Sequence, residues 1–159
     1  MPLLIAIDDP RRDDVLTLLR AHWAFAHDNT PPEDVHALDL DGLLDPSVTF
    51  FSARRDGVLV GVGALKRLDA SHAELKSMHT AAIARGEGVG GALLEQLLAF
   101  ARAAGYARVS LETGAMESFV PARAMYARAG FVECEPFGDY VPSRNSTFMT
   151  RTVAPASPT

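Results

Sequence analysis

Residues 85–91 read Arg-Gly-Glu-Gly-Val-Gly-Gly and lead directly into a segment with the spacing of an α-helix. Leu93, Leu94 and Leu97 fall on one face of that segment, and Gly105 is a natural end point. The first turn of a helix exposes unpaired backbone N–H groups and the positive end of the helix dipole, and glycines let a phosphate approach without meeting a Cβ. The segment therefore predicts a pyrophosphate site, made by Arg85, Gly86, Glu87, Gly88, Val89, Gly90 and Gly91.

Length and charge limit the classes of protein to which the chain can belong. Its 159 residues suit one domain, which we place at residues 1–152, followed by a disordered tail at residues 153–159 with two prolines. The net charge is −5 and the isoelectric point is near 5.5, and the sequence has no basic stripe. A nucleic-acid partner is therefore not expected.

Targeting signals and membrane segments are not apparent in the sequence. The single Cys134 excludes an intramolecular disulfide, and the N-terminus lacks a basic region followed by a continuous apolar run. No apolar run approaches the ~20 residues that cross a bilayer. We therefore expect a cytoplasmic protein with no membrane partner.

The N-terminal third is expected to contain a strand and two helices. Residues 3–7 predict the strand, and Asp8-Asp9-Pro10 predicts the cap and first position of a helix that ends before residues 30–32. Residues 33–44 predict a short, weaker helix. Five acidic residues lie in this region and form either a site that attracts a cationic small molecule or a solvated face. They are Glu33, Asp34, Asp39, Asp41 and Asp45.

A hairpin and an irregular strand follow. Two β-rich runs, at residues 48–53 and 58–65, flank an Asp-Gly pair that is typical of a hairpin turn. Residues 71–80 predict the next strand, but Leu75 and Met78 are three positions apart rather than two or four. This change of phase predicts a β-bulge, which leaves backbone groups free to bind a ligand.

The C-terminal half adds a parallel connection. Residues 107–111 predict a strand, so strand, helix and strand form a right-handed crossover. A helix at residues 118–129, a short strand from residue 131 and a strand at residues 146–152 complete the chain. The fold class is therefore a mixed α/β sheet, mostly antiparallel, with one parallel crossover and a bulged fourth strand. Its open edge leaves room for a second subunit, as in a homodimer.

Arg85, Gly88 and Gly90 have the spacing of a known signature, in which Gln or Arg is followed by two residues, Gly, one residue, and Gly or Ala. With the bulged strand before it and Tyr126 ahead of a Gly-Phe pair after it, the chain resembles the GNAT superfamily of acetyl-CoA-dependent N-acyltransferases. Residues 111–114 and 136–140 resemble the YsnE-like bacterial branch, which lacks a secure substrate assignment.

The resemblance implies an acyl-CoA N-acyltransferase fold that binds acetyl-CoA in a gap between the bulged strand and the parallel strand. Backbone at Met78, His79 and Thr80 would hold the pantetheine arm, and the Met78 amide would polarise the thioester carbonyl. The acceptor would be a primary amine of a small molecule or peptide, which attacks directly in a ternary complex. The histidines lack metal-site spacing, so no metal is expected.

The same resemblance nominates catalytic residues. Tyr126 would be the general acid for the departing thiolate, with a core aromatic as the alternative interpretation. Glu112 and Glu74 lie on strands that flank the expected gap, and each is a candidate base or a solvated strand end. His79 is expected near the thioester, where an imidazole suits proton transfer. The alternative is that His79 is a half-buried strand residue. Cys134 lies past the motif and is expected to be structural.

The acceptor side is less defined. Polar residues late in the chain are candidates for the acceptor pocket, with turn formation as an equal alternative: Asp139, Tyr140, Asn145 and Ser146. The family often has Asn seven residues before the tyrosine, whereas Phe119 stands there in this chain. This departure removes any contact that the asparagine would make.

Two other functions remain open from the sequence. Gly86, Gly88 and Gly91 also fit the Gly-x-Gly-x-x-Gly motif of dinucleotide-binding oxidoreductases, with Glu112 about twenty residues later. The preceding antiparallel strands and the single crossover argue against that class. A non-catalytic acyl-CoA sensor on the same fold is the second alternative, and the presence of Tyr126 with two carboxylates favours an enzyme.

Overall fold

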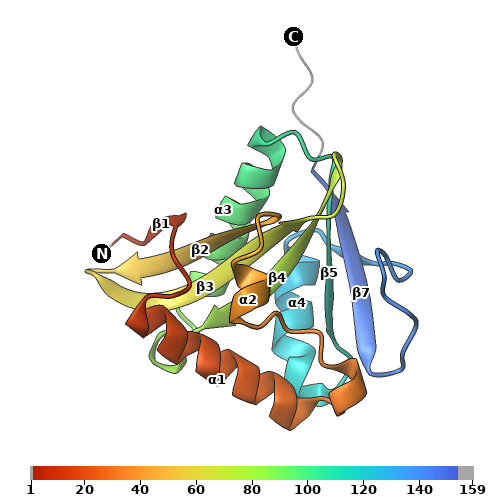
Figure 1. Cartoon of the computed structure of the whole chain (residues 1–159), viewed down its shortest axis with the longest axis horizontal. Coiled ribbons are helices and arrows are strands. Elements are labelled where there is room, and N and C mark those ends of the chain that lie inside the picture. Colours follow the sequence, from red (N-terminus) through yellow and green to blue (C-terminus); the bar gives the residue numbers. More distant parts are fainter. Residues whose placement is uncertain (1, 154–159) are drawn as a thin grey trace.

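The computed structural model describes residues 2–153, which fold around one mixed sheet (Figure 1). Within this range seven strands pair in the order β1-β2-β3-β4-β5-β7-β6, and β4 and β5 form the parallel pair. The predicted fold class is therefore confirmed. The strands are β1 (Leu4–Ile7), β2 (Val48–Arg55), β3 (Val58–Arg67), β4 (His72–Thr80), β5 (Arg108–Gly114), β6 (Val132–Glu133) and β7 (Ser146–Thr152).

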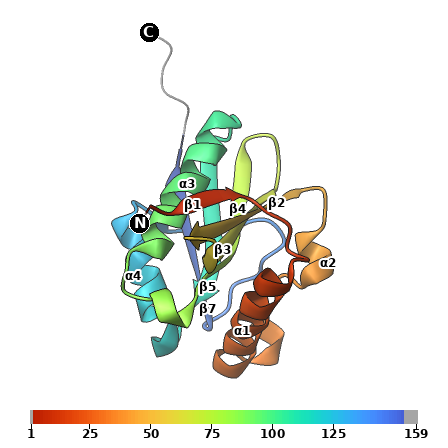
Figure 2. The ribbon, with the colours of Figure 1, turned by 90° about the vertical axis from the view of Figure 1, so that its left-hand side faces the viewer.

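Helices cover both faces of the sheet. In Figure 2, α3 and α4 lie on one side of the sheet, and α1 and α2 lie on the other. Short 3₁₀ turns connect several of these elements, and none of the helices in the described range is long and apolar enough to cross a membrane. The helices and turns are α1 (Asp13–Asn29), η1 (Pro32–Asp34), α2 (Leu40–Leu43), η2 (Ala82–Ala84), α3 (Val89–Ala103), η3 (Glu117–Phe119) and α4 (Val120–Arg128).

Alternation along the central strands divides the core between the two faces. Val62 and Ala64 of β3 are fully buried in the cluster that contains the apolar side chains of α1. The other face packs on α3, whose Leu93 and Leu97 are also fully buried. Gly63 of β3 permits this close packing, because a Cβ there would lie 2.5 Å from the sulfur of a β4 methionine.

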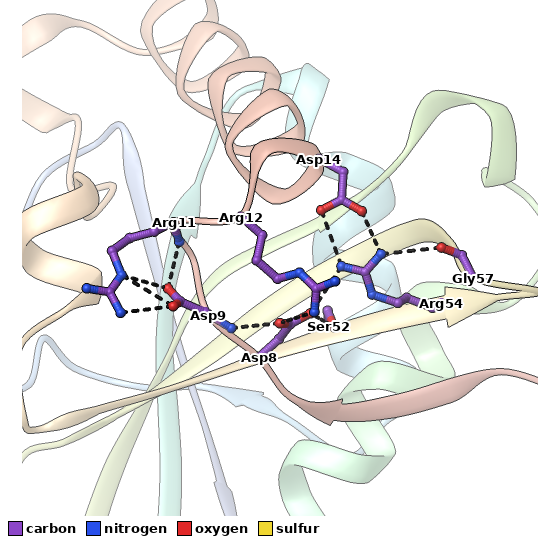
Figure 3. Close-up of polar contacts among 8 residues, drawn as sticks. All are labelled: Asp8, Asp9, Arg11, Arg12, Asp14, Ser52, Arg54 and Gly57. Carbon is purple, nitrogen blue, oxygen red and sulfur yellow. Dashed lines mark hydrogen bonds and ion pairs between the residues drawn. The ribbon is translucent and has the colours of Figure 1, made fainter.

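The start of α1 differs from the sequence prediction. The helix begins at Asp13 rather than at Pro10, and no side chain caps it. The Asp8 carboxylate instead accepts hydrogen bonds from Ser52 Oγ (2.6 Å) and Arg54 Nη2 (3.2 Å) on β2 (Figure 3). Arg54 Nη1 also donates to the Asp14 carboxylate at 2.6 Å, in the first turn of α1. The cluster therefore anchors the helix over the sheet.

The helix predicted at residues 33–44 is wrong in extent, since only η1 and the four-residue α2 form there. Two backbone carbonyls of the intervening segment accept bonds from distant side chains instead of from helical amides. Trp23 Nε1 donates to Leu38 O (2.8 Å), and Lys76 Nζ donates to His36 O (2.9 Å). Asp39 then starts α2 by accepting a bond from the Gly42 amide (2.8 Å).

Other element boundaries follow the sequence closely. The hairpin turns at Asp56-Gly57, and Gly105, with a φ of +91°, follows the last turn of α3. Val153 was assigned to the tail, but it is buried and its amide donates to Ala107 O at 2.8 Å. The packed region therefore extends past the predicted boundary at residue 152, and the rest of the predicted tail lies outside the described residues.

Candidate active site

The parallel strands β4 and β5 separate partway along their length. They pair at three positions, from His72 opposite Arg108 to Glu74 opposite Ser110. Beyond this point a cavity of about 880 Å³ lies between them, and α1, the loop after η1, the glycine-rich loop and α4 complete its walls. A gap of this kind, with free strand edges on both sides, can hold an extended ligand arm.

The predicted β-bulge forms in β4 beside this gap. Ser77 and Met78 together oppose Gly63 of β3, and Ser77 has a φ of +58°, which is unusual for a residue other than glycine. Met78, His79 and Thr80 line the cavity, as do Leu75 to Ser77. The bulge and the strand separation thus leave the predicted part of β4 facing the gap.

The glycine-rich loop forms a further part of the cavity wall. Gly86 and Gly88 have φ values of +80° and +82°, a conformation that glycine adopts without strain. The first hydrogen bond of the α3 ladder here runs from the Ala92 amide to Gly88 O (3.0 Å), so the three amides between them precede it. A Cβ added to Gly91 would meet nothing within 4 Å, so the space beside this residue is open.

Six of the seven residues predicted in this loop line the cavity: Arg85, Gly86, Gly88, Val89, Gly90 and Gly91. The exception is Glu87, whose exposed carboxylate pairs with Arg55 outside the cavity. The donor set of backbone amides at a helix N-terminus, with one arginine, suits a pyrophosphate. The loop therefore fits the phosphate end of a coenzyme A thioester.

Glu112 and Tyr126 both line the cavity, from β5 and α4. Burial raises the pKa of Glu112 to about 7, although the Ser146 hydroxyl on β7 opposes the shift. Tyr126 is 7% exposed, and burial together with the Glu112 carboxylate raises its pKa. At neutral pH the cavity therefore holds a carboxyl group poised between its two protonation states and a protonated phenol.

Glu74, the other candidate base, occupies a different environment. It is 3% exposed and does not line the cavity. Its carboxylate accepts a hydrogen bond from the Tyr140 hydroxyl and lies 3.4 Å from Lys76 Nζ, which also donates to that hydroxyl at 2.9 Å. This placement argues against Glu74 as a base, because it is enclosed away from the cavity and its carboxylate is already bonded to Tyr140. Lys76 was missed, although its spacing of two from Glu74 places both on one face of the strand.

His79 forms a pair that the sequence did not reveal. Its Nδ1 lies 3.2 Å from Nδ1 of His22 on α1, and both rings line the cavity. Burial lowers both pKa values to about 4. The two imidazoles are therefore neutral at pH 7, and a pKa this low makes His79 a weak proton acceptor. The only sequence signal was a histidine on the apolar face of the predicted first helix.

The residues nominated for the acceptor pocket have separate roles. Asn145 Nδ2 and Ser143 Oγ each donate to Asp34 Oδ2 at 3.0 Å, and Asp34 lines the cavity. Tyr140 contacts Glu74 behind the cavity, Ser146 lies beside the base candidate, and Asp139 is exposed and does not line it. Of the five acidic residues that the sequence grouped between positions 33 and 45, Asp34 is the one that lines the cavity.

The Cys134 thiol is half-buried, burial raises its pKa, and it does not line the cavity. This environment matches the structural role expected of it. In residues 2–153, no group of three or more His, Cys, Asp or Glu side chains is arranged to hold a metal ion.

Comparison with known proteins identifies the family. Residues 13–131 match the acetyltransferase (GNAT) family. The uncharacterised N-acetyltransferase YsnE of Bacillus subtilis is 46% identical over 147 residues, which cover 92% of this chain and 97% of YsnE. YedL of Escherichia coli, also an uncharacterised N-acetyltransferase, is 40% identical and covers 94% of each chain. An IAA acetyltransferase of Azospirillum brasilense is 37% identical, over 92% of this chain and 95% of the relative.

Solved structures agree with this result. A protein of Klebsiella pneumoniae assigned as an acyl-CoA N-acyltransferase matches with a TM-score of 0.81 at 28% identity, covering 95% of this chain and 97% of that one. An aminoglycoside 6′-N-acetyltransferase in complex with coenzyme A matches in fold, with a TM-score of 0.72 at 14% identity, over 98% and 99% of the two chains.

These findings overturn the dinucleotide-binding alternative, since the glycine motif lies in a mostly antiparallel sheet with a single parallel pair among the described strands. They also favour an enzyme over a sensor, because the full-length relatives are named as acetyltransferases. Enzymes of this fold use acetyl-CoA as the acyl donor. The chain therefore belongs to the GNAT family and is an acetyl-CoA-dependent N-acetyltransferase.

Proposed function

We propose that this enzyme transfers an acetyl group from acetyl-CoA to the primary amine of a small molecule, with Glu112 as the general base and Tyr126 as the general acid. The observation that carries the proposal is the position of Glu112, a largely buried carboxyl group that lines the cavity with a pKa of about 7. Such a group accepts a proton near neutral pH more readily than a solvated glutamate.

Acetyl-CoA would contribute an acetyl group activated as a thioester. The amides of Val89, Gly90 and Gly91 are the groups that would hold its pyrophosphate, with Arg85 beside them. The edge of β4 from Met78 to Thr80 would pair with the pantetheine arm, much as a neighbouring strand would. These residues line one cavity of about 880 Å³, which supports an extended donor molecule.

Glu112 would take one proton from the incoming ammonium group, so that the neutral nitrogen can attack the thioester carbon. The Met78 amide would stabilise the negative charge that develops on the carbonyl oxygen. As the carbon–nitrogen bond forms and the carbon–sulfur bond breaks, Tyr126 would protonate the departing sulfur. The second proton lost by the nitrogen restores the phenol, so one proton leaves the site through Glu112.

The shape of the acceptor end supports a small molecule over a folded protein. Residues of α1 and of the loop after η1, including Asp34, Val35 and His36, line the cavity and would enclose the acceptor. The acidic Asp34 favours a cationic acceptor, which is the state in which a primary amine arrives at pH 7. A flexible peptide with a free N-terminus is the second acceptor class that fits these walls.

The test is release of the coenzyme A thiol from acetyl-CoA in the presence of small amines, peptides with free N-termini, and IAA, which the name of one relative suggests. Acetyl transfer to small amines is the expected result. Saturable acetyl-CoA binding without thiol release with any acceptor would indicate the sensor function instead. Transfer to peptides alone would replace the proposed acceptor class.

A further inference from the structure

Two phenylalanine rings form part of the wall of the cavity. Phe25 of α1 and Phe119 of η3 meet edge to face, with ring centroids 5.3 Å apart and an interplanar angle of 71°. Both rings line the cavity, together with Glu112 and Gly114 of β5. This aromatic wall, defined by Phe25 and Phe119, therefore stands beside the group proposed to accept the amine proton.

Neighbouring groups fix the position of the Phe119 ring. A Cβ on Gly114 would lie 2.2 Å from the Phe119 ring, so only glycine lets the ring rest on the end of β5. Arg123 Nη1 donates to Gly114 O (2.7 Å) and Met116 O (3.0 Å), which ties the turn to α4.

The charges beside the wall favour a cation without a carboxylate. The hydrogen bonds from Asn145 and Ser143 to Asp34 lower the pKa of its carboxyl group, so it is ionised at neutral pH. Two cations near the wall are already bonded to protein groups. Lys76 Nζ contacts His36 O, the Tyr140 hydroxyl and the Glu74 carboxylate, and Arg123 Nη1 donates to Gly114 O and Met116 O. A substrate carboxylate would have to displace one of these partners.

We propose that the acceptor is an arylalkylamine, in which a primary amine is joined by a short chain to a flat aromatic ring and no carboxylate is present. The inference rests on the proposed function and specifies its substrate class. The ring would pack against the aromatic wall, and the ammonium group would lie between Asp34 and Glu112. Aromatic rings prefer edge-to-face or offset contacts of the kind that the wall offers.

The experiment compares kcat/KM for 2-phenylethylamine, ethanolamine and phenylalanine at a saturating concentration of acetyl-CoA. Burying one aromatic ring should favour 2-phenylethylamine over ethanolamine by about tenfold or more. Phenylalanine, which adds only a carboxylate, should react about tenfold less well than 2-phenylethylamine. Equal values for 2-phenylethylamine and ethanolamine would overturn the acceptor class while leaving acetyl transfer to amines intact.

Substitution of Phe119 tests whether the aromatic wall causes the preference for 2-phenylethylamine. Phe119→Asn should reduce the ratio between 2-phenylethylamine and ethanolamine about tenfold, with the acetyl-CoA Kd unchanged. Phe100→Leu is the matched control, because Phe100 also forms an edge-to-face pair, with Phe51, but lies outside the cavity. An unchanged ratio in Phe119→Asn would overturn the inference. Absence of turnover with every amine would overturn the proposed function itself.

Discussion

Replacement of Glu112 by glutamine separates its catalytic role from its effect on stability. Burial raises the pKa of Glu112 from 4.5 to about 7, so the folded protein holds this proton over a pH range in which the unfolded chain has lost it. The free energy of unfolding should therefore fall as pH rises from 4.5 to 7. The shift corresponds to a loss on the order of 3 kcal/mol, reached fully above pH 7.

Glutamine has nearly the same shape and carries no charge, so Glu112→Gln should avoid this loss. Urea unfolding should show little difference between the variant and the parent near pH 4.5. At pH 8 the variant should be more stable, by on the order of 3 kcal/mol. In the same variant, kcat/KM for the amine should fall about 100-fold or more at pH 8. In the parent, kcat/KM should rise with pH through about 7, as Glu112 loses its proton.

Glu95→Gln provides the control, because Glu95 also lines the cavity but is exposed on α3. It should change neither the stability at pH 8 nor the pH profile. Two results would refute the reasoning about Glu112. One is a stability difference between Glu112→Gln and the parent that is the same at pH 5 and pH 8. The other is a variant that keeps parental turnover.

Three further substitutions test the loop, the acid and the packing of the acceptor end. Gly91→Ala should raise stability by about 1 kcal/mol, since alanine is the better helix former. It should also weaken acetyl-CoA binding, because its Cβ enters the open space beside the first turn of α3. If calorimetry shows an unchanged affinity for acetyl-CoA, the space beside Gly91 is not the phosphate site. Gly88 is a poorer position for this test, since its φ of +82° would strain any other residue. Tyr126→Phe should lower kcat about 10²-fold with little change in acetyl-CoA Kd, and equal turnover would remove the proposed acid. Gly114→Ala should destabilise the protein by about 1–3 kcal/mol in urea unfolding, because its Cβ would overlap the Phe119 ring, and parental stability would show that the ring moves freely.

The parts of the site that depend on local sequence were predictable. The glycine-rich loop was recognised because its glycines and the following helix lie within one continuous segment, and the bulge because Leu75 and Met78 break the alternation of a strand. Contacts between distant segments were not predictable in this way. His22 and His79 are 57 positions apart, and no local pattern indicates that their rings meet.

The two glutamates show why such contacts matter for function. Glu74 and Glu112 were both candidate bases from the sequence, since each lies on a strand that flanks the expected gap. Pairing between β4 and β5 ends at Glu74 and Ser110, and Glu112 lies two residues beyond that point, where the strands have separated. Glu74 is consequently enclosed and bonded to Tyr140, whereas Glu112 reaches the cavity as a desolvated carboxyl group. The position of each glutamate relative to the point of strand separation, rather than its residue type, therefore determines which one is suited to act as the base.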